Sequence, residues 1–230
     1  MRTLIRSLAV TLSLAVCCTA FGAGGGSMPM PTPSDENIRS RSPELQARML
    51  YNNGVRAVEK GDDLLAEAAR QTDEKKKEKL RAKAEQSFNI AMAKFVKSLE
   101  VQPGMYEAWN YVGYSQRKLG HYQDALTAYD KTLSLKPGYP QAIEYRGHAY
   151  LGLDRLSEAK EAYLTLFSGN RKLAATLLTA MQEWVGAHRS NAAGVDGAML
   201  ESFASWVNER STIAGQTVGL TREGAASAWH

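Results

Sequence analysis

The sequence predicts an all-α protein in which pairs of helices stack into a short solenoid. From residue 44 onward, long helix-forming segments are separated by Gly and Pro, and no run alternates β-branched with polar residues. Two Pro-Gly pairs, Pro103-Gly104 and Pro137-Gly138, lie 34 residues apart. A fixed period of this length is typical of helical repeats, in which each unit buries its apolar face against its neighbours.

Residues of the same type recur at equivalent positions of successive units. Ala91, Ala125 and Ala159 are spaced by 34 residues, and each is followed four positions later by an aromatic residue. Small residues let two helices approach closely, and large residues fill the space beside the contact. The landmarks of this pattern are Gly54, Ala91, Phe95, Pro103, Trp109, Gly113, Ala125, Tyr129, Pro137, Gly147, Tyr150, Ala159 and Tyr163.

The unit from Tyr106 to Tyr139 resembles a tetratricopeptide repeat, whose pattern is Trp-x2-Leu-Gly-x2-Tyr, then Ala-x3-Phe, then Pro. Gln116 departs from this pattern where the family has an aromatic residue. Residues 140–168 resemble a second unit, in which Arg146 occupies a normally apolar position. The resemblance implies a short right-handed solenoid of about three helix pairs that binds a protein or peptide and needs no cofactor.

The first unit, residues 44–105, is interrupted by an insertion. Its landmarks Gly54 and Ala91 are 37 residues apart, whereas the equivalent pair of the next unit is 12 apart. The difference of 25 residues predicts a helical hairpin with a turn near residues 71–73, protruding about 18 Å beyond its neighbours. The charged tip, residues 73–79, mixes both signs, which favours a solvated tip over a site for nucleic acid or lipid headgroups.

Apolar residues recur at helical spacing in two further segments, residues 171–189 and 195–210. We expect these helices to form a divergent pair, within residues 169–211, that caps the repeats. Residues 212–230 are mostly small and polar, so we expect them to be a flexible tail.

The N-terminal segment, residues 1–23, has a basic start, a short apolar run and an exit of small residues, which is typical of a secretory signal peptide. Residues 24–43 are rich in Gly, Pro and Ser and predict a flexible linker. Both cysteines, Cys17 and Cys18, lie in the signal segment, and Val16 fits badly before a lipidated cysteine. We therefore expect a periplasmic or secreted protein. Lipoprotein anchoring is disfavoured, and we expect membrane contact only if a cysteine is lipidated.

Composition and motifs give no support for catalysis, metal binding or nucleic-acid binding. Removal of residues 1–23 leaves a net charge of +2, which is too weak to indicate nucleic acid as a partner. The four histidines share no motif, and the sequence contains neither a phosphate-binding loop nor a Gly-x-Ser-x-Gly element. The sequence therefore predicts no catalytic residue, no metal ligand and no enzyme.

The resemblance also implies where a partner binds. In the family, the first helix of each repeat lines a concave groove, chiefly through its second, fifth, ninth and twelfth positions. By register, these positions include Arg48, Val55, Val58 and Leu151. The candidate partner-binding residues are Tyr51, Glu107, Asn110, Tyr114, Arg117, Gln141, Glu144 and His148. Their mixture of aromatic and polar side chains suits a peptide or partner helix, and the alternative interpretation is a set of solvated helix faces.

The leading hypothesis is a non-catalytic scaffold or adaptor that binds a protein or peptide in the cell envelope. The second hypothesis is a lipid-anchored or membrane-associated assembly factor for the outer membrane, a pilus or a secretion machinery. A third is a structural protein that associates with itself to form a homo-oligomer. The Lys-x3-Asn pair with which some members of the family hold a chaperone's carboxylate is missing, which argues against that activity.

Overall fold

The computed structural model describes residues 42–190 and 195–227, all of which belong to one compact unit. The predicted signal peptide, residues 1–23, and the predicted linker up to residue 41 lie outside the described residues. The described residues form eight helices and no strand, which confirms the predicted all-α fold class.

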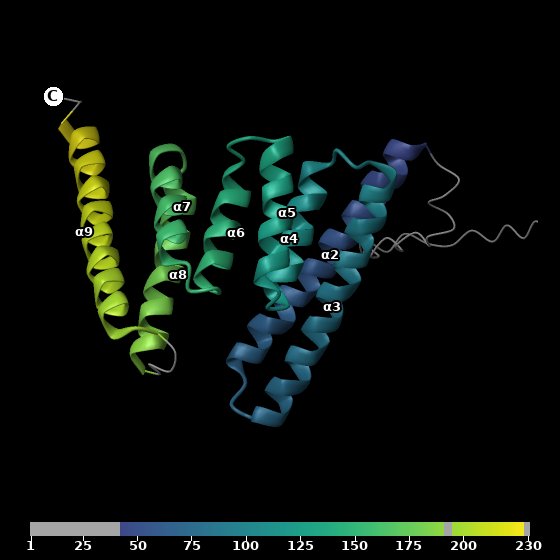
Figure 1. The fold of residues 1–230 in the computed structure, drawn as a ribbon, viewed down its shortest axis with the longest axis horizontal. Helices are drawn as coiled ribbons and strands as arrows, with labels where there is room; N and C mark the ends of the chain where they lie inside the picture. The colour runs from purple at the N-terminus through teal and green to yellow at the C-terminus, as the bar shows by residue number, and fades with distance from the viewer. Residues whose placement is uncertain (1–41, 191–194, 228–230) are drawn as a thin grey trace, which may run out of the picture. The chain divides into compact units, whose positions relative to one another are not determined.

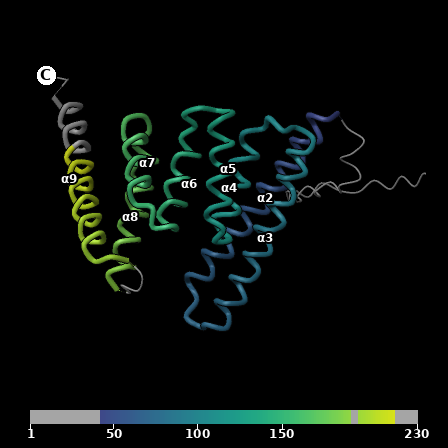
Figure 2. Tube along the Cα trace, viewed as in Figure 1, coloured from purple at the N-terminus to yellow at the C-terminus, as the bar shows by residue number. Residues whose placement is uncertain are grey.

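The helices follow the chain in order. They are α2 (Pro43–Arg70), α3 (Glu74–Val101), α4 (Tyr106–Lys118), α5 (Tyr122–Leu135), α6 (Pro140–Leu151), α7 (Leu156–Gly169), α8 (Arg171–Ser190) and α9 (Gly197–Ser227). Each helix packs against the next one in the chain, so α2 pairs with α3, α4 with α5, α6 with α7 and α8 with α9 (Figures 1 and 2). The fold is thus a tetratricopeptide-like helical-repeat solenoid of three pairs followed by a C-terminal pair.

In each of the first two pairs, the helices approach most closely where a glycine of one helix faces an aromatic ring of the other. A Cβ atom on Gly54 would lie 2.5 Å from the ring of Phe95, and one on Gly113 would lie 2.5 Å from the ring of Tyr129. Both rings are completely buried. Since no side chain fits between helix and ring at this distance, the glycines set the spacing of the two helices in each pair.

The third pair departs from this arrangement. A Cβ atom on Gly147 would meet Leu177 of α8 at 2.6 Å, because α6 packs against α8 as well as α7. Tyr163, which the repeat pattern aligns with Tyr129, contacts Trp206 of α9 with the ring centroids 5.5 Å apart. The C-terminal pair therefore continues the core of the last repeat.

The interrupted first unit forms the longest hairpin of the repeats (Figure 1). Its arms, α2 and α3, have 28 residues each, whereas α4 has 13 and α5 has 14. At 1.5 Å per residue, each arm is about 20 Å longer than the helices of the next pair. The side chain of Asp73 accepts hydrogen bonds from the backbone N–H groups of Lys75 and Lys76, which caps the start of α3.

A second glycine–aromatic contact closes the hairpin towards its tip. A Cβ atom on Gly61 would lie 2.8 Å from the ring of Phe88, which is 1% exposed. Gly61 follows Gly54 by seven residues, and Phe88 precedes Phe95 by seven residues. Seven residues are about two helical turns, so the two contacts lie on the same faces of the antiparallel arms.

The last helix ends the solenoid with a polar outer face. The inward side of α9 buries Leu200, Phe203 and Val207, whereas Glu201 and Asn208 are exposed. Repeat proteins need such a polar face at their ends to remain soluble. The helix continues to Ser227, past residue 212, where we expected a flexible tail. The segment after residue 211 contains no proline, and its glycines weaken a helix without ending it.

Candidate functional site

Four tyrosines form a row across the first helices of the repeats. Tyr51 of α2 contacts Tyr111 of α4 with the ring centroids 5.7 Å apart, and Tyr111 contacts Tyr114 at 6.2 Å. Tyr114 in turn contacts Tyr145 of α6 at 5.0 Å. All three contacts are edge-to-face, and each ring is only partly exposed. We call these four residues the tyrosine row.

The helical geometry of α4 places two of the four rings together. Tyr111 and Tyr114 are three residues apart, so they lie on the same face of α4 and reach the helices on either side. Phe95 of α3 supports the row from below, stacked on Tyr111 with the centroids 5.2 Å apart. Aromatic pairs of this kind stabilise a packed face by about 0.5–1.5 kcal/mol each.

Basic side chains cover both ends of the tyrosine row. The guanidinium of Arg48 lies 5.9 Å from the ring centroid of Tyr51. The guanidinium of Arg117 lies 5.1 Å from the centroid of Tyr114 and 5.5 Å from that of Tyr145. At these distances a cation is attracted to the negative face of the ring. The row therefore combines aromatic surface with positive charge.

A polar contact ties the middle of the row to the hairpin. The hydroxyl of Tyr114 donates a hydrogen bond of 2.6 Å to Asp62 of α2, and the ammonium of Lys118 lies 2.7 Å from the other carboxylate oxygen. The same ammonium lies 5.9 Å from the ring centroid of Phe88 on α3. We call Asp62, Tyr114 and Lys118 the brace, because they connect both hairpin arms to α4.

Burial raises the pKa of the hydroxyls of the row, so they stay protonated in alkaline as well as neutral solution. It is the main cause that raises the pKa of Tyr51, Tyr111 and Tyr114 above the ordinary value of 10, and the hydrogen bond to Asp62 adds to the effect at Tyr114. Burial, with the nearby charge of Glu144, raises the pKa of Tyr145 to about 12. Neutral hydroxyls can donate and accept hydrogen bonds, which suits recognition of a peptide backbone.

The predicted groove residues differ in how far they are exposed. Tyr51 and Tyr114 belong to the row, and Arg117 covers it. Asn110 and Glu144, at the fifth position of α4 and α6, are only 3% and 4% exposed. This differs from our expectation that they offer hydrogen bonds to a partner. The first helices of successive repeats contact each other, and in α4 and α6 the fifth position is buried in the packing between helices.

The remaining predicted positions vary in exposure. Gln141 is exposed, and Glu107 and His148 are partly exposed. The ring nitrogen Nε2 of His148 lies 2.8 Å from the buried carboxylate of Glu144. Among the other positions selected by register, Arg48 is exposed and Val55 is partly exposed. Leu151 and Val58 are buried.

Sequence reasoning missed Tyr111, Tyr145, Asp62 and Lys118. Tyr111 and Tyr145 each follow a predicted fifth position by one residue, and they are 34 residues apart. This spacing was a signal in the sequence, because a side chain repeated at the period of the fold lies on the same face of successive units. No comparable signal exists for Asp62, which lies in the insertion.

The row ends beside a pocket of about 360 Å³ between α4, α6 and α8. Arg117 lines both the row and the pocket, together with His148 of α6 and with Trp184 and His188 of α8. The indole N–H of Trp184 donates a hydrogen bond of 3.2 Å to Asp154, and the His188 ring stacks on the indole with the centroids 3.8 Å apart. The surface with aromatic and basic side chains therefore extends beyond the three repeats onto the C-terminal pair.

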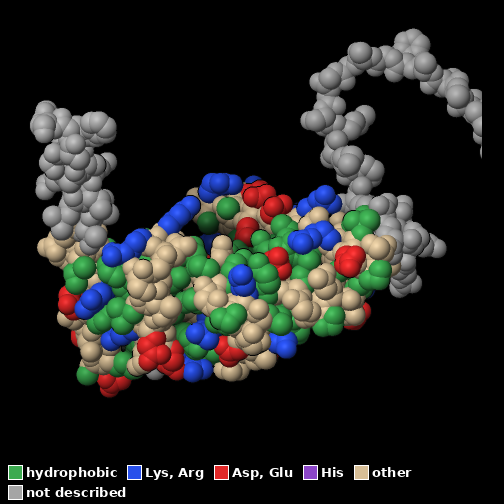
Figure 3. All heavy atoms as spheres, turned by 90° about the horizontal axis from the view of Figure 1, so that it is seen from above, with side chains coloured by type: hydrophobic (Ala, Val, Ile, Leu, Met, Phe, Trp, Pro, Cys, Tyr) green, Lys and Arg blue, Asp and Glu red, His purple; other side chains and the backbone are tan. Residues whose placement is uncertain are grey.

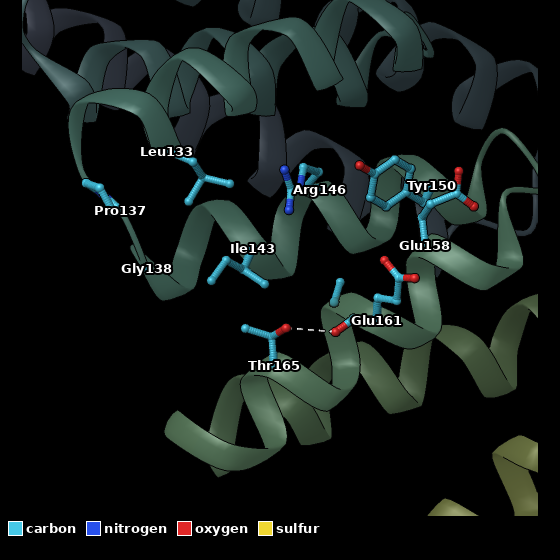
Figure 4. A pocket seen from close by; sticks show the side chains of 10 residues that line it. Leu133, Pro137, Gly138, Ile143, Arg146, Tyr150, Glu158, Glu161 and Thr165 are labelled. Atoms are coloured by element: carbon cyan, nitrogen blue, oxygen red, sulfur yellow. Dashed lines mark hydrogen bonds between the residues drawn. The ribbon is translucent and has the colours of Figure 1, made fainter.

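A second pocket, of about 440 Å³, lies between α5, α6 and α7 (Figure 4). Arg146 projects into it and forms an ion pair of 2.9 Å with Asp130. Arg146 stands where the repeat pattern has an apolar residue, so its charged group stays near the surface above the apolar side chains of Leu133 and Ile143. Glu158 at the rim is paired with Arg155. The pocket combines an apolar wall with charged side chains, of which Arg146 and Glu158 are paired.

The face of the molecule drawn in Figure 3 has no single dominant charge. In the view of Figure 3, basic and acidic side chains are interspersed with hydrophobic and uncharged ones. Within the described residues, no group of three or more His, Cys, Asp or Glu side chains could hold a metal ion. None of the described helices combines the length and the apolar character that crossing a membrane requires.

Comparison with known families agrees with the fold. The sequence model of the tetratricopeptide repeat matches residues 106–139, which form α4, α5 and the turn that follows. No curated protein matches the chain. The chain thus contains a tetratricopeptide repeat within an all-α repeat fold. Repeats of this class generally mediate protein–protein interactions, and their folds are typically scaffolds rather than enzymes.

Proposed function

We propose that the protein is a non-catalytic adaptor that binds a protein or peptide along the tyrosine row. The observation that carries the proposal is the partly exposed line of Tyr51, Tyr111, Tyr114 and Tyr145, with Arg48 and Arg117 at its ends. Tyr and Arg are the residues that contribute most to binding at protein interfaces. A rigid, pre-formed row also loses little conformational entropy on binding.

The chemistry of the row favours an extended segment with apolar side chains. The partly exposed rings offer apolar surface to such side chains, and protonated hydroxyls can bond to the backbone of the ligand. Arg48 and Arg117 add a preference for a carboxylate at either end of the bound segment.

Capture of partners from an envelope extract tests the proposal. Arg48→Ala and Tyr145→Ala should each reduce recovery of a partner at least severalfold, because each removes part of the row. Leu164→Ala and Ile90→Ala are matched controls, since these side chains are 47% and 49% exposed on α7 and α3 and lie outside the row. Equal recovery with the row variants and the controls would rule the row out as the binding surface.

We also propose that the partner lies in the cell envelope, in the periplasm or outside the cell. The support is the signal-like pattern of residues 1–23, which lie outside the described residues. A mass spectrum of the purified mature protein tests this directly, because cleavage near residues 20–24 gives an unmodified N-terminus. A lipidated Cys17 or Cys18 at the N-terminus would instead favour the membrane-anchored assembly factor. Light scattering on the same sample distinguishes a monomeric adaptor from a self-associating protein.

A further inference from the structure

The hairpin tip carries an excess of positive charge. Residues 67–83 contain seven basic and four acidic side chains, a net charge of +3, whereas the whole chain has a net charge of +4. Two of the four acidic side chains already form hydrogen bonds with neighbouring residues. Asp73 caps the start of α3, and Glu74 accepts a hydrogen bond of 3.0 Å from the ammonium of Lys77.

Three of the basic groups converge on one face of α3. Lys76, Lys79 and Lys83 are spaced by three and four residues, so they lie along the same side of the helix. With Leu80 of α3 and with Glu67 and Gln71 near the end of α2, they line a hollow of about 350 Å³. All three are exposed, and within the described residues their ammonium groups form no ion pair or hydrogen bond. We call Lys76, Lys79, Leu80 and Lys83 the lysine face.

The lysine face is carried on a rigid arm. The brace joins α2 to α4 through the 2.6 Å hydrogen bond between Tyr114 and Asp62. Beyond it, the contact between Gly61 and Phe88 and the fully buried Ala84 hold the two arms together. A charged surface that is already positioned loses little conformational freedom when it binds.

We propose that the lysine face binds an acidic segment of a partner protein, at a site separate from the tyrosine row. Lys76, Lys79 and Lys83 provide unpaired positive charge, and Leu80 between them provides apolar contact for a side chain of the same segment. Even with the carboxylate of Glu67 on the rim, the hollow keeps a net charge of +2. Charge complementarity of this kind gives a partner its orientation and a faster association.

Two other anionic partners fit the surface less well. A lipid bilayer presents a flat, uniformly anionic surface, and the carboxylates of Glu67 and Glu78 beside the lysines would oppose it. Single-stranded nucleic acid binds through bases stacked on aromatic rings, and residues 67–83 contain no aromatic side chain. A peptide can place its carboxylates between the acidic groups and its apolar side chain on Leu80.

Fluorescence anisotropy with the purified protein tests the proposal. The probe is a short labelled peptide of glutamate and leucine, and a second peptide with glutamine in place of glutamate reports charge-independent binding. Lys79→Glu combined with Lys83→Glu should weaken binding of the glutamate peptide about tenfold, since two charge pairs become repulsive. Lys77→Glu combined with Arg81→Glu makes the same change of charge on the opposite side of the same helix, outside the hollow. This control should weaken binding less than about threefold.

The two pairs of variants separate a site from general attraction. Circular dichroism and urea unfolding of both double variants must match the parent, so that a difference reports binding alone. Equal weakening by both pairs would overturn the proposal, because binding would then depend only on the net charge of the tip. Tighter binding to vesicles of phosphatidylcholine and phosphatidylglycerol, or to single-stranded DNA, than to the glutamate peptide would also overturn it.

Discussion

Replacing Gly113 by alanine tests the closest approach of the two helices in the repeat formed by α4 and α5. The new Cβ atom would lie 2.5 Å from Cε1 and 2.7 Å from Cδ1 of the Tyr129 ring. Atoms in folded proteins do not approach this closely, so the ring or the helix must move. Tyr129 is completely buried beside the equally buried Ala125, which leaves the ring no space to move into.

The expected magnitude follows from two opposing effects. Overpacking of a tight core costs about 1–3 kcal/mol. Alanine in place of glycine inside a helix stabilises the folded state by about 1 kcal/mol, because alanine has the higher helix propensity. A contact of 2.5 Å with a fully buried ring lies in the upper part of the overpacking range, at about 2–3 kcal/mol. We therefore expect Gly113→Ala to lower the free energy of unfolding by about 1–2 kcal/mol.

Urea unfolding followed by circular dichroism measures this change, and the chain offers a matched control. Gly186 lies within α8, and a Cβ atom there would meet nothing within 4 Å. Gly186→Ala should therefore raise the free energy of unfolding by about 0.5–1 kcal/mol, a change of opposite sign. In the Tyr129→Leu background, which removes the ring, the additional cost of Gly113→Ala should become smaller. A Gly113→Ala protein as stable as the parent would refute the assignment of Gly113 as the closure of the repeat.

Two further predictions concern the brace and the tyrosine row. Asp62→Ala removes the hydrogen bond to Tyr114 and the ion pair to Lys118, so amide hydrogen exchange in residues 63–83 should accelerate while exchange in α5 stays unchanged. Uniform acceleration in both regions would show that Asp62 does not act on the hairpin in particular. The second prediction is alkaline destabilisation. Because burial raises the pKa of Tyr145 to about 12 in the folded protein, the unfolded chain releases this proton first as the pH rises past 10. The contribution to stability is complete below pH 10 and is lost as the pH rises towards 12, and urea unfolding at a series of alkaline pH values should show this decline. Ionisation of all tyrosines near pH 10 in the folded protein, measured by ultraviolet absorbance, would contradict it.

Much of the fold could be predicted because the residues that recur at the repeat period face the core. Gly113 and Tyr129 face each other in one pair, and Gly54 and Phe95 face each other in another, so the pattern captured a physical contact. The pattern was less informative for the third pair. Gly147 meets Leu177 of α8, a residue outside any repeat, so its contact depends on how the divergent C-terminal pair packs.

The binding surface was harder to predict than the core. Position numbers carried over from the family select Asn110 and Glu144, but the rotation of α4 and α6 against their neighbours buries both. That rotation presents Tyr111 and Tyr145, one residue further on. A shift of one residue turns a helix by about 100°, so a small difference in packing decides which side chain reaches the surface. Asp62 could not be found from the pattern at all, because its partner Tyr114 lies 52 residues away.

Site-specific photocrosslinking tests binding along the tyrosine row most directly. Gln141 is exposed on α6, four residues before Tyr145 and on the same face of the helix, so a photoreactive residue there lies beside the row. Gln123 is exposed on α5 and is the control position. The account predicts a discrete crosslinked partner from position 141 that is absent from position 123 and is lost when Tyr145→Ala is added. The same products from both positions, or no product from position 141, would contradict it.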